Sequence, residues 1–214
     1  KTFFILFFVV ATELIGFGLI IPVLPQIAMS FNISPVYLGV LMGAYSFAQF
    51  FAAPLLGAWS DRIGRRPVLL MSKMGTVIAY CVLAFSNSFW LFLLARTLDG
   101  FTGGNISVAR AYVADVTTAK DRPRGMAVIG MAFGFGFVIG PALGGLLYGG
   151  VLGHMLPSFV AAFLSLLAYF FTLFFLKEPK NRQNNKQSIF SFFSNFKLIK
   201  NHYVAVVLFV YFIY

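Results

Sequence analysis

The stretch Gly57-Ala58-Trp59-Ser60-Asp61-Arg62-Ile63-Gly64-Arg65-Arg66-Pro67 sets one acid and three arginines between two apolar segments. Segment 38–59 leads into it without a charge, and segment 67–86 follows it with Lys73 as its only charge. Each segment has the roughly 20 residues that a helix needs to cross a bilayer. The stretch therefore predicts a tight charged hairpin between two transmembrane helices. Gly64 is expected to allow the turn, and Gly57 is expected to let helices approach closely.

The residues of this hairpin leave two interpretations open. Asp61 lies at the end of a helix, where a carboxylate is unfavourable unless a cation or a helix N-terminus is near it. That placement favours a charged latch between helices. Alternatively, the arginines only orient the hairpin toward the cytoplasm, as basic loops of membrane proteins generally do.

The composition indicates an integral membrane protein. Hydrophobic residues make up 60% of the chain and charged residues 10%, whereas a soluble domain carries about 25% charged residues. The net charge of +10 does not indicate nucleic-acid binding, because the basic residues lie in short loops between apolar segments. Cys81 is the only cysteine, which excludes an internal disulfide and a cysteine metal site.

Six apolar segments are long enough to cross a bilayer and predict an all-α bundle over residues 1–176. They are residues 3–25, 38–59, 67–86, 89–112, 125–148 and 156–176. Residues 177–201 are predicted to form a cytoplasmic linker, which contains either an amphipathic surface helix or simply the approach to the next span. Residues 202–214 predict the start of a seventh helix, inside which the sequence is expected to be cut.

The distribution of basic residues predicts the orientation. Loops 26–37, 87–88 and 149–155 contain no Lys or Arg. Of the 16 Lys and Arg residues, all but Lys73, Arg96 and Arg110 lie at the N-terminus or in the remaining loops. The positive-inside rule then places the N-terminus in the cytoplasm, and the protein in the inner (plasma) membrane.

Ionisable side chains inside the bilayer are costly and usually face a partner or a cavity. Glu13 lies about 15 Å into the first helix, near the midplane. Because burial disfavours a charged carboxyl, Glu13 is expected to exchange a proton or to act on the substrate. The alternative is a permanent ion pair with Arg96 or Lys73. Arg96 is expected to pair with Asp99 at i+3.

Other polar groups at membrane depth leave alternatives open. Tyr45, Gln49 and Asn105 are expected either to face a substrate cavity or to form interhelical hydrogen bonds. Lys73 and Arg110 are interpreted as side chains that extend toward the membrane surface.

The fifth apolar segment contains Gly136-Phe137-Val138-Ile139-Gly140-Pro141-Ala142-Leu143-Gly144-Gly145. Glycine pairs spaced four apart, at 130/134, 136/140, 140/144 and 145/149, predict close helix packing. Pro141 removes one helix hydrogen bond and is expected to bend the helix. The residues fit either a packed pivot or ordinary helix packing.

The hairpin resembles the loop signature of the major facilitator superfamily, G-x-x-x-D-R-x-G-R-R/K, between that family's second and third helices. The matching residues are Gly57, Asp61, Arg62, Gly64, Arg65 and Arg66. The resemblance implies a latch that holds the cytoplasmic helix ends together in the outward-open state. It also implies that Asp115 of helix four joins Asp61 and Arg65.

Further motifs resemble the drug–proton antiporters of this superfamily, and their bacterial tetracycline-efflux branch in particular. Gly136, Gly140, Pro141, Gly144 and Gly145 match the helix-five motif of proton-driven exporters. Arg96-Thr97-Leu98-Asp99-Gly100 resembles a helix-four motif whose arginine is implicated in proton coupling, and Glu13 falls where the branch has an acid. The resemblance covers nearly all of residues 1–178. It departs at Ala79, where the branch has an acid, and at Lys73 and Arg110, and so implies antiport more than tetracycline as the cargo.

These features predict the N-terminal six-helix half of a major facilitator fold plus the start of helix seven. The predicted function is proton-coupled export of lipophilic small molecules by alternating access. The alternative is a facilitator-fold carrier of another cargo, such as a sugar, a siderophore or a metabolite. A seven-helix receptor is disfavoured by the cytoplasmic N-terminus, and enzyme activity by the lack of catalytic motifs. The expected partners are the substrate, protons, lipid and a C-terminal half, in a monomer without metal or cofactor.

Overall fold

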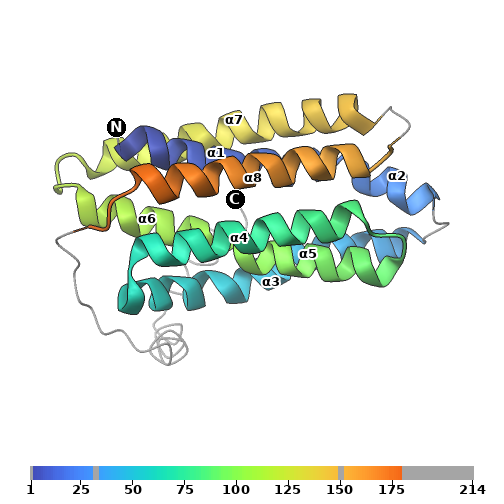
Figure 1. The fold of residues 1–214 in the computed structure, drawn as a ribbon, viewed down its shortest axis with the longest axis horizontal. Helices are drawn as coiled ribbons and strands as arrows, with labels where there is room; N and C mark the ends of the chain where they lie inside the picture. Colours follow the sequence, from blue (N-terminus) through green and yellow to red (C-terminus); the bar gives the residue numbers. More distant parts are fainter. Residues whose placement is uncertain (1, 31–33, 149–151, 180–214) are drawn as a thin grey trace, which may run out of the picture.

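The computed structural model describes residues 2–30, 34–148 and 152–179 (Figure 1). These residues form α1 (Thr2–Ile20), α2 (Val23–Ser30), α3 (Pro35–Ile63), α4 (Arg65–Ala84), α5 (Phe89–Gly103), α6 (Asn105–Val116), α7 (Arg122–Tyr148) and α8 (Met155–Phe175). The six predicted spans are all present, but two of them are divided. The predicted seventh helix and most of the predicted linker lie outside the described residues.

The first and fourth spans are divided at residues that break a helix. α1 ends before Pro22, which has no backbone N–H to donate, and α2 continues the first span. α5 and α6 meet at Gly104, where a Cβ would lie 2.9 Å from the backbone nitrogen of Ala53. Five spans, the first counted across the turn between α1 and α2, therefore meet the length and hydropathy of a membrane crossing, and the fourth consists of two shorter helices.

The helices run side by side and bring the basic loops to one end of the bundle (Figure 1). That end, called the basic end below, holds the N-terminus, the α3–α4 turn, the α6–α7 loop and the end of α8. The opposite end holds α2 and the α4–α5 loop. This separation is the one that the positive-inside pattern predicts.

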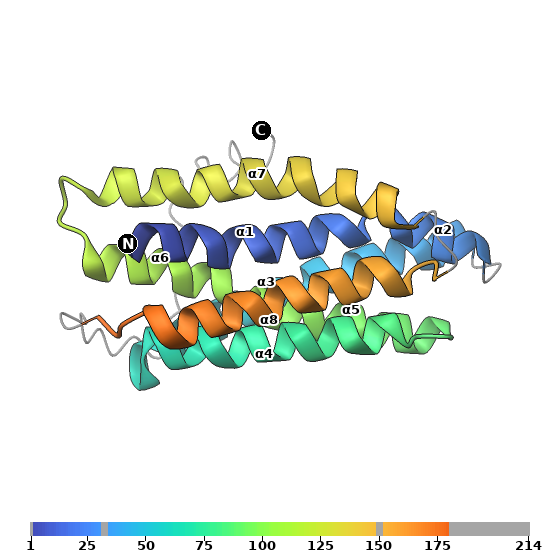
Figure 2. The same cartoon turned by 45° about the horizontal axis from the view of Figure 1, so that its top comes forward.

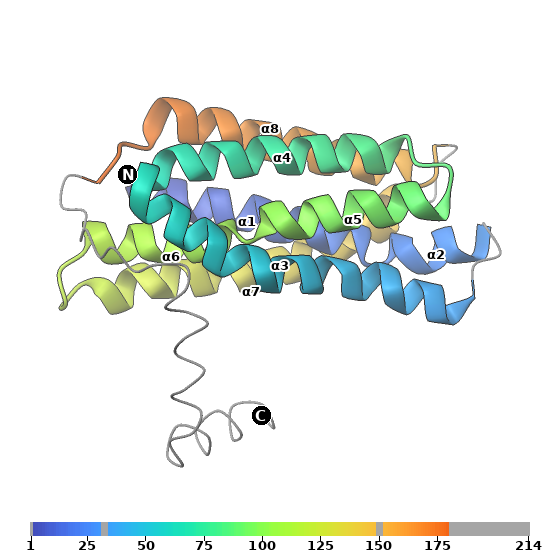
Figure 3. The same cartoon turned by 90° about the horizontal axis from the view of Figure 1, so that it is seen from below.

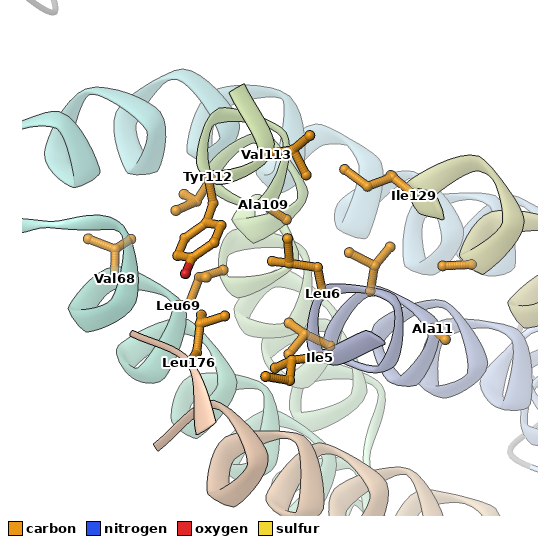
Figure 4. Close-up of a cluster of buried hydrophobic side chains, with 14 of the residues drawn as sticks. Ile5, Leu6, Ala11, Val68, Leu69, Ala109, Tyr112, Val113, Ile129 and Leu176 are labelled. Carbon is orange, nitrogen blue, oxygen red and sulfur yellow. The ribbon is translucent and has the colours of Figure 1, made fainter. Parts of the chain in front are cut away.

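α1 runs through the middle of the bundle. Figure 2 shows it between α7 on one side and α8 and α4 on the other. Seen from below, α5 lies between α4 and α3 (Figure 3). Near the basic end, side chains from α3, α4, α6 and α7 and from Leu176 close around those of α1; Leu69, Ala109 and Ile129 pack there around Leu6 of α1 (Figure 4).

Only one face of α7 uses its glycines for close packing. Gly136, Gly140 and Gly144 are buried against α1, and a Cβ at Gly140 would lie 2.7 Å from the Cα of Gly18. Gly130, Gly134 and Gly145 have no described neighbour within 4 Å of a Cβ position. The predicted close-packing pair 130/134 is therefore not seen against the described helices, because a single α7 face meets α1, and the pair 145/149 includes Gly149, which lies outside the described residues.

Large apolar side chains cover much of the outer surface, as expected for a protein whose solvent is lipid. Phe47, Phe135, Leu146, Phe163 and Phe174 are all exposed. A soluble protein rarely exposes so large an apolar surface. With its six spans, the chain is a multi-pass membrane protein.

His154 makes the opposite end of the bundle sensitive to pH. Its Nε2 atom lies 3.0 Å from the carbonyl oxygen of Ser86. Burial lowers the pKa of His154 from 6.5, and the Ser86 carbonyl opposes that effect. Because the folded state favours the neutral ring, the stabilisation is present above about pH 6.5 and is lost as the pH falls through the lower, folded-state pKa.

As the pH is lowered from about 8 to 5, we therefore expect the full-length protein to lose thermal stability below about pH 6.5, and His154→Gln to lose less. The measurement is the midpoint of thermal unfolding in detergent across that range. Parallel pH profiles for the two proteins would remove His154 from this role.

Candidate functional site

The charged hairpin, residues 57–67, contributes to an ion-pair group at the basic end that is centred on Arg65. The guanidinium of Arg65 lies 2.6 Å from Asp61 Oδ1 at the end of α3 and 2.8 Å from Asp115 Oδ2 at the end of α6. Arg65 Nη1 also donates to Ser60 Oγ at 2.6 Å. The side chains of Arg65 and Asp115 are only 6% and 8% exposed. The structure thus brings together Asp61, Arg65 and Asp115, with the cation that Asp61 was expected to need.

Glu178, which the sequence analysis did not single out, adds α8 to this group. Its carboxylate accepts hydrogen bonds from the backbone nitrogens of Arg65 at 2.7 Å and Arg66 at 2.9 Å. These are first-turn N–H groups of α4, which have no partner within the helix and favour a negative charge. We call Asp61, Arg65, Asp115 and Glu178 the end clamp, because together they tie α3, α4, α6 and the end of α8.

The remaining residues of the hairpin differ in what they do. Gly64 has φ 121°, and a Cβ there would lie 2.9 Å from Glu178 Oε1, so the prediction of a turn that needs glycine is confirmed. Gly57 makes no unusually close approach to the described helices, because a Cβ there would have Ser107 Oγ as its nearest described atom, at 3.7 Å. Arg66 Nη2 donates to the Leu173 carbonyl at 2.5 Å, and Arg62 is exposed.

Deep in the bundle, Glu13 is joined to α4 and α6. Glu13 Oε2 lies 2.5 Å from Lys73 Nζ and accepts a hydrogen bond from Asn105 Nδ2 at 3.0 Å. Glu13 and Lys73 are 1% and 0% exposed. The interpretation that Lys73 extends to the membrane surface is wrong, because its rotation on α4 points it at α1. Arg110, by contrast, is exposed as expected.

A second buried ion pair lies on α5. Arg96 Nη1 donates to Asp99 Oδ2 at 2.8 Å, and both residues are 1% exposed. The Arg96 guanidinium also lies 4.7 Å from the ring centre of Tyr45 and 5.5 Å from that of Phe17. The predicted i+3 pair is confirmed, and two aromatic rings from α3 and α1 cover its cation.

The two pairs form one buried charge cluster: Glu13, Lys73, Arg96 and Asp99. Thr76 Oγ1 donates to Glu13 Oε1 at 3.5 Å and lies 2.9 Å from Thr102 Oγ1. Thr102 Oγ1 also lies 3.1 Å from the backbone carbonyl oxygen of Asp99. This hydroxyl chain runs from the Glu13 carboxyl through Thr76 of α4 to the backbone of Asp99 in α5.

Two of the three uncharged polar residues form interhelical hydrogen bonds, one of the two alternatives open from the sequence. Gln49 Nε2 of α3 donates to the Gly103 carbonyl of α5 at 3.0 Å, and Asn105 Nδ2 of α6 donates to Glu13 of α1 at 3.0 Å. Tyr45 Oη accepts from Gln49 at 3.1 Å within α3. Asn105 and the ring of Tyr45 therefore contact the buried charge cluster, and Gln49 is joined to it through Tyr45.

Sequence reasoning missed Glu178, Thr76 and Thr102. Glu178 carried one signal, because it is the only acid after residue 121 and directly follows the sixth apolar segment. Threonines in transmembrane helices commonly bond to their own backbone. Thr76 and Thr102 therefore carried no distinguishing signal.

The chain matches known proteins along its length. A sequence profile described as the Major Facilitator Superfamily matches residues 6–214. Tetracycline resistance protein, class B, of Escherichia coli is 36% identical over 176 residues, which is 81% of this chain and 43% of that protein. The class C protein of Escherichia coli is 43% identical over 135 residues, which is 61% of this chain and 34% of that protein.

One human protein is similar to this chain in both sequence and structure. Human major facilitator superfamily domain-containing protein 10 is 47% identical over 107 residues, 50% of this chain and 24% of that protein. The crystal structure of the human organic anion transporter MFSD10 (TETRAN) has a TM-score of 0.74 and 32% sequence identity, and the match covers 88% of this chain and 50% of that one. The chain thus spans about half the length of the relatives that it matches.

Proposed function

This chain belongs to the major facilitator superfamily, and from that premise we propose that it is the N-terminal half of a proton-coupled exporter of lipophilic small molecules. Its relatives are transporters and not enzymes. In this proposal, cargo and protons cross the membrane in opposite directions as the carrier opens alternately to each side.

The buried charge cluster is the observation that supports proton coupling. A buried ion pair gives little net stability, because desolvation of both charges offsets their attraction. Glu13, Lys73, Arg96 and Asp99 are each at most 1% exposed, so this cost applies fully to both pairs. Ionisable residues kept inside a membrane generally lie on an ion or substrate pathway. We infer that the cluster exchanges protons and that Tyr45, Gln49 and Asn105 contribute to the adjoining cargo site.

We propose the end clamp as the part that alternates. It ties four helices through side chains at their ends, a contact set that can form in one conformation and open in another. In the outward-open state the clamp holds the cytoplasmic ends closed. Gly136, Gly140, Pro141 and Gly144 then provide the close α1–α7 contact on which the helices move, and Gly145 lies outside that contact.

The cargo of the human relative suggests a second candidate, export of organic anions. The structure adds one observation in its favour: two cations, Lys73 and Arg96, lie in the buried charge cluster. A carboxylate on the cargo would be attracted to Lys73 if Glu13 were protonated, or to Arg96 if Asp99 were protonated.

The proposal also covers the membrane in which the carrier lies, its orientation, its working unit and its energy source. We propose that it lies in the inner (plasma) membrane with the basic end in the cytoplasm. We also propose that a monomer with its C-terminal half is the working unit, and that the proton gradient drives it without a cofactor. Residues 1–214 alone are not expected to transport.

The test is transport by the full-length protein in proteoliposomes with an acidic interior, using tetracycline and a fluorescent organic anion as probes. An exporter that exchanges cargo for protons accumulates at least one probe above its equilibrium level, and a protonophore abolishes the accumulation. Equal uptake with and without the pH gradient would instead identify a facilitator that is not coupled to protons.

A further inference from the structure

The buried charge cluster contains two carboxyls, and they are not equally able to take a proton. From the sequence alone, the position of Glu13 near the bilayer midplane favours Glu13 as the residue that takes the proton. The contacts of each carboxyl oxygen, and those of each paired cation, favour Asp99.

Glu13 is held as a carboxylate by its partners. Oε2 accepts from Lys73 and Asn105, and Oε1 accepts from Thr76. A proton on Glu13 would remove the counter-charge of Lys73, which is 0% exposed and bonds to Glu13 alone among the described residues. A buried charge that loses its partner is strongly destabilising, because nothing replaces its lost hydration.

Asp99 has an oxygen that needs a proton. Oδ2 accepts from Arg96, but Oδ1 is buried without a hydrogen-bond partner among the described residues. A buried carboxylate oxygen without a donor loses its hydration and receives nothing in return. Protonation turns that oxygen into a donor and removes the mismatch.

Arg96 tolerates the loss of the Asp99 charge better than Lys73 tolerates the loss of Glu13. Its guanidinium lies over the rings of Tyr45 at 4.7 Å and Phe17 at 5.5 Å. Such a cation–π contact stabilises a cation more strongly when it is shielded from water. Lys73 has no ring contact of this kind among the described residues.

Tyr80 supplies the partner for the proton. Its hydroxyl is buried, has no hydrogen-bond partner among the described residues and interacts with Asp99. It is held in place by α1, because a Cβ on Gly16 would lie 2.8 Å from it. A proton on Oδ1 would let Asp99 donate to Tyr80 Oη, so that both of these buried oxygens gain a hydrogen bond that neither has among the described residues.

The charged and titratable groups around Asp99 come from every helix packed on it. They are Arg96 on α5 itself, Tyr80 and Lys73 on α4, Glu13 on α1 and Tyr45 on α3. We propose that Asp99 holds the exchangeable proton with Tyr80 as its hydrogen-bond partner, while Glu13 stays ionised as the counter-charge of Lys73.

The proposal depends on the proposed function for the use of the proton, but protonation itself can be measured without transport. The experiment is a pH titration of the full-length protein by infrared difference spectroscopy, which follows the carbonyl band of a protonated carboxylic acid. The wild type is expected to gain such a band as the pH is lowered. Asp99→Asn should remove it, Glu13→Gln should keep it, and Tyr80→Phe should change its frequency.

A band that survives in Asp99→Asn and disappears in Glu13→Gln would overturn the proposal. So would a wild type that gains no carbonyl band of a protonated buried acid as the pH is lowered. If Asp99→Asn does not fold, Asp99→Glu keeps an acid at the position and must change the frequency of the band. An unchanged frequency in that variant would equally overturn the proposal. A titrating Asp99 in a carrier that shows no proton-coupled flux would instead contradict the proposed function alone.

Discussion

Gly144→Ala is expected to destabilise the full-length protein by about 1–3 kcal/mol, the usual cost of overpacking a close contact. A Cβ at Gly144 would overlap the backbone carbonyl oxygen of Leu19 and would lie 2.9 Å from Pro22 Cγ. Backbone atoms cannot move aside as a flexible side chain can, so α7 must move away from α1. The measurement is the midpoint of thermal unfolding of the purified protein in detergent.

The next residue provides a matched control. Gly145 has no described neighbour within 4 Å of its Cβ position, and an alanine there improves helix propensity by about 1 kcal/mol. Gly145→Ala should therefore unfold at the wild-type temperature or above it. Equal losses for both variants would mean that the α1–α7 contact is not what makes Gly144 necessary.

Arg65→Ala is expected to open the end clamp and abolish most transport. The change leaves the carboxylate of Asp115, 8% exposed, without its cation and Ser60 without its donor. Removing one partner of a buried pair typically costs about 3–5 kcal/mol. If the clamp forms in only one conformation, that cost falls on this conformation, and the population shifts to the other.

Arg124→Ala is the control for the loss of one arginine at the same end. Arg124 is 85% exposed and lies 3.7 Å from Asp121, a pair that is too exposed to contribute much stability. The measurement is probe accumulation in proteoliposomes, together with labelling of single cysteines placed at each end of the bundle. Normal accumulation and labelling by Arg65→Ala would leave the hairpin with an orienting role only.

Much of the fold could be predicted because its rules are local. Segment length and hydropathy were enough for the six spans, and the basic loops were enough to separate the two ends. Arg96 and Asp99 lie three residues apart on one helix, so their pairing followed from helix geometry. The pairing of Arg65 with Asp115 was reached through the family resemblance and not from spacing.

What could not be predicted depends on how each helix is rotated against its neighbours. Lys73 could extend to the surface or turn inward, and only the packing of α4 on α1 decides that it meets Glu13. In the same way, the rotation of α7 against α1 buries Gly144 and leaves Gly145 without a close described neighbour. The break at Gly104 follows from the close approach of α3, which no local pattern contains.

In the proposed mechanism, cargo and a proton compete for the buried charge cluster. The most direct measurement is proton release from the purified full-length protein in weak buffer, as a ligand chosen by thermal shift from tetracyclines and organic anions is added. We expect saturable release from the wild type, and binding without release from Asp99→Asn. Binding to the wild type without any release, or equal release from both proteins, would contradict it.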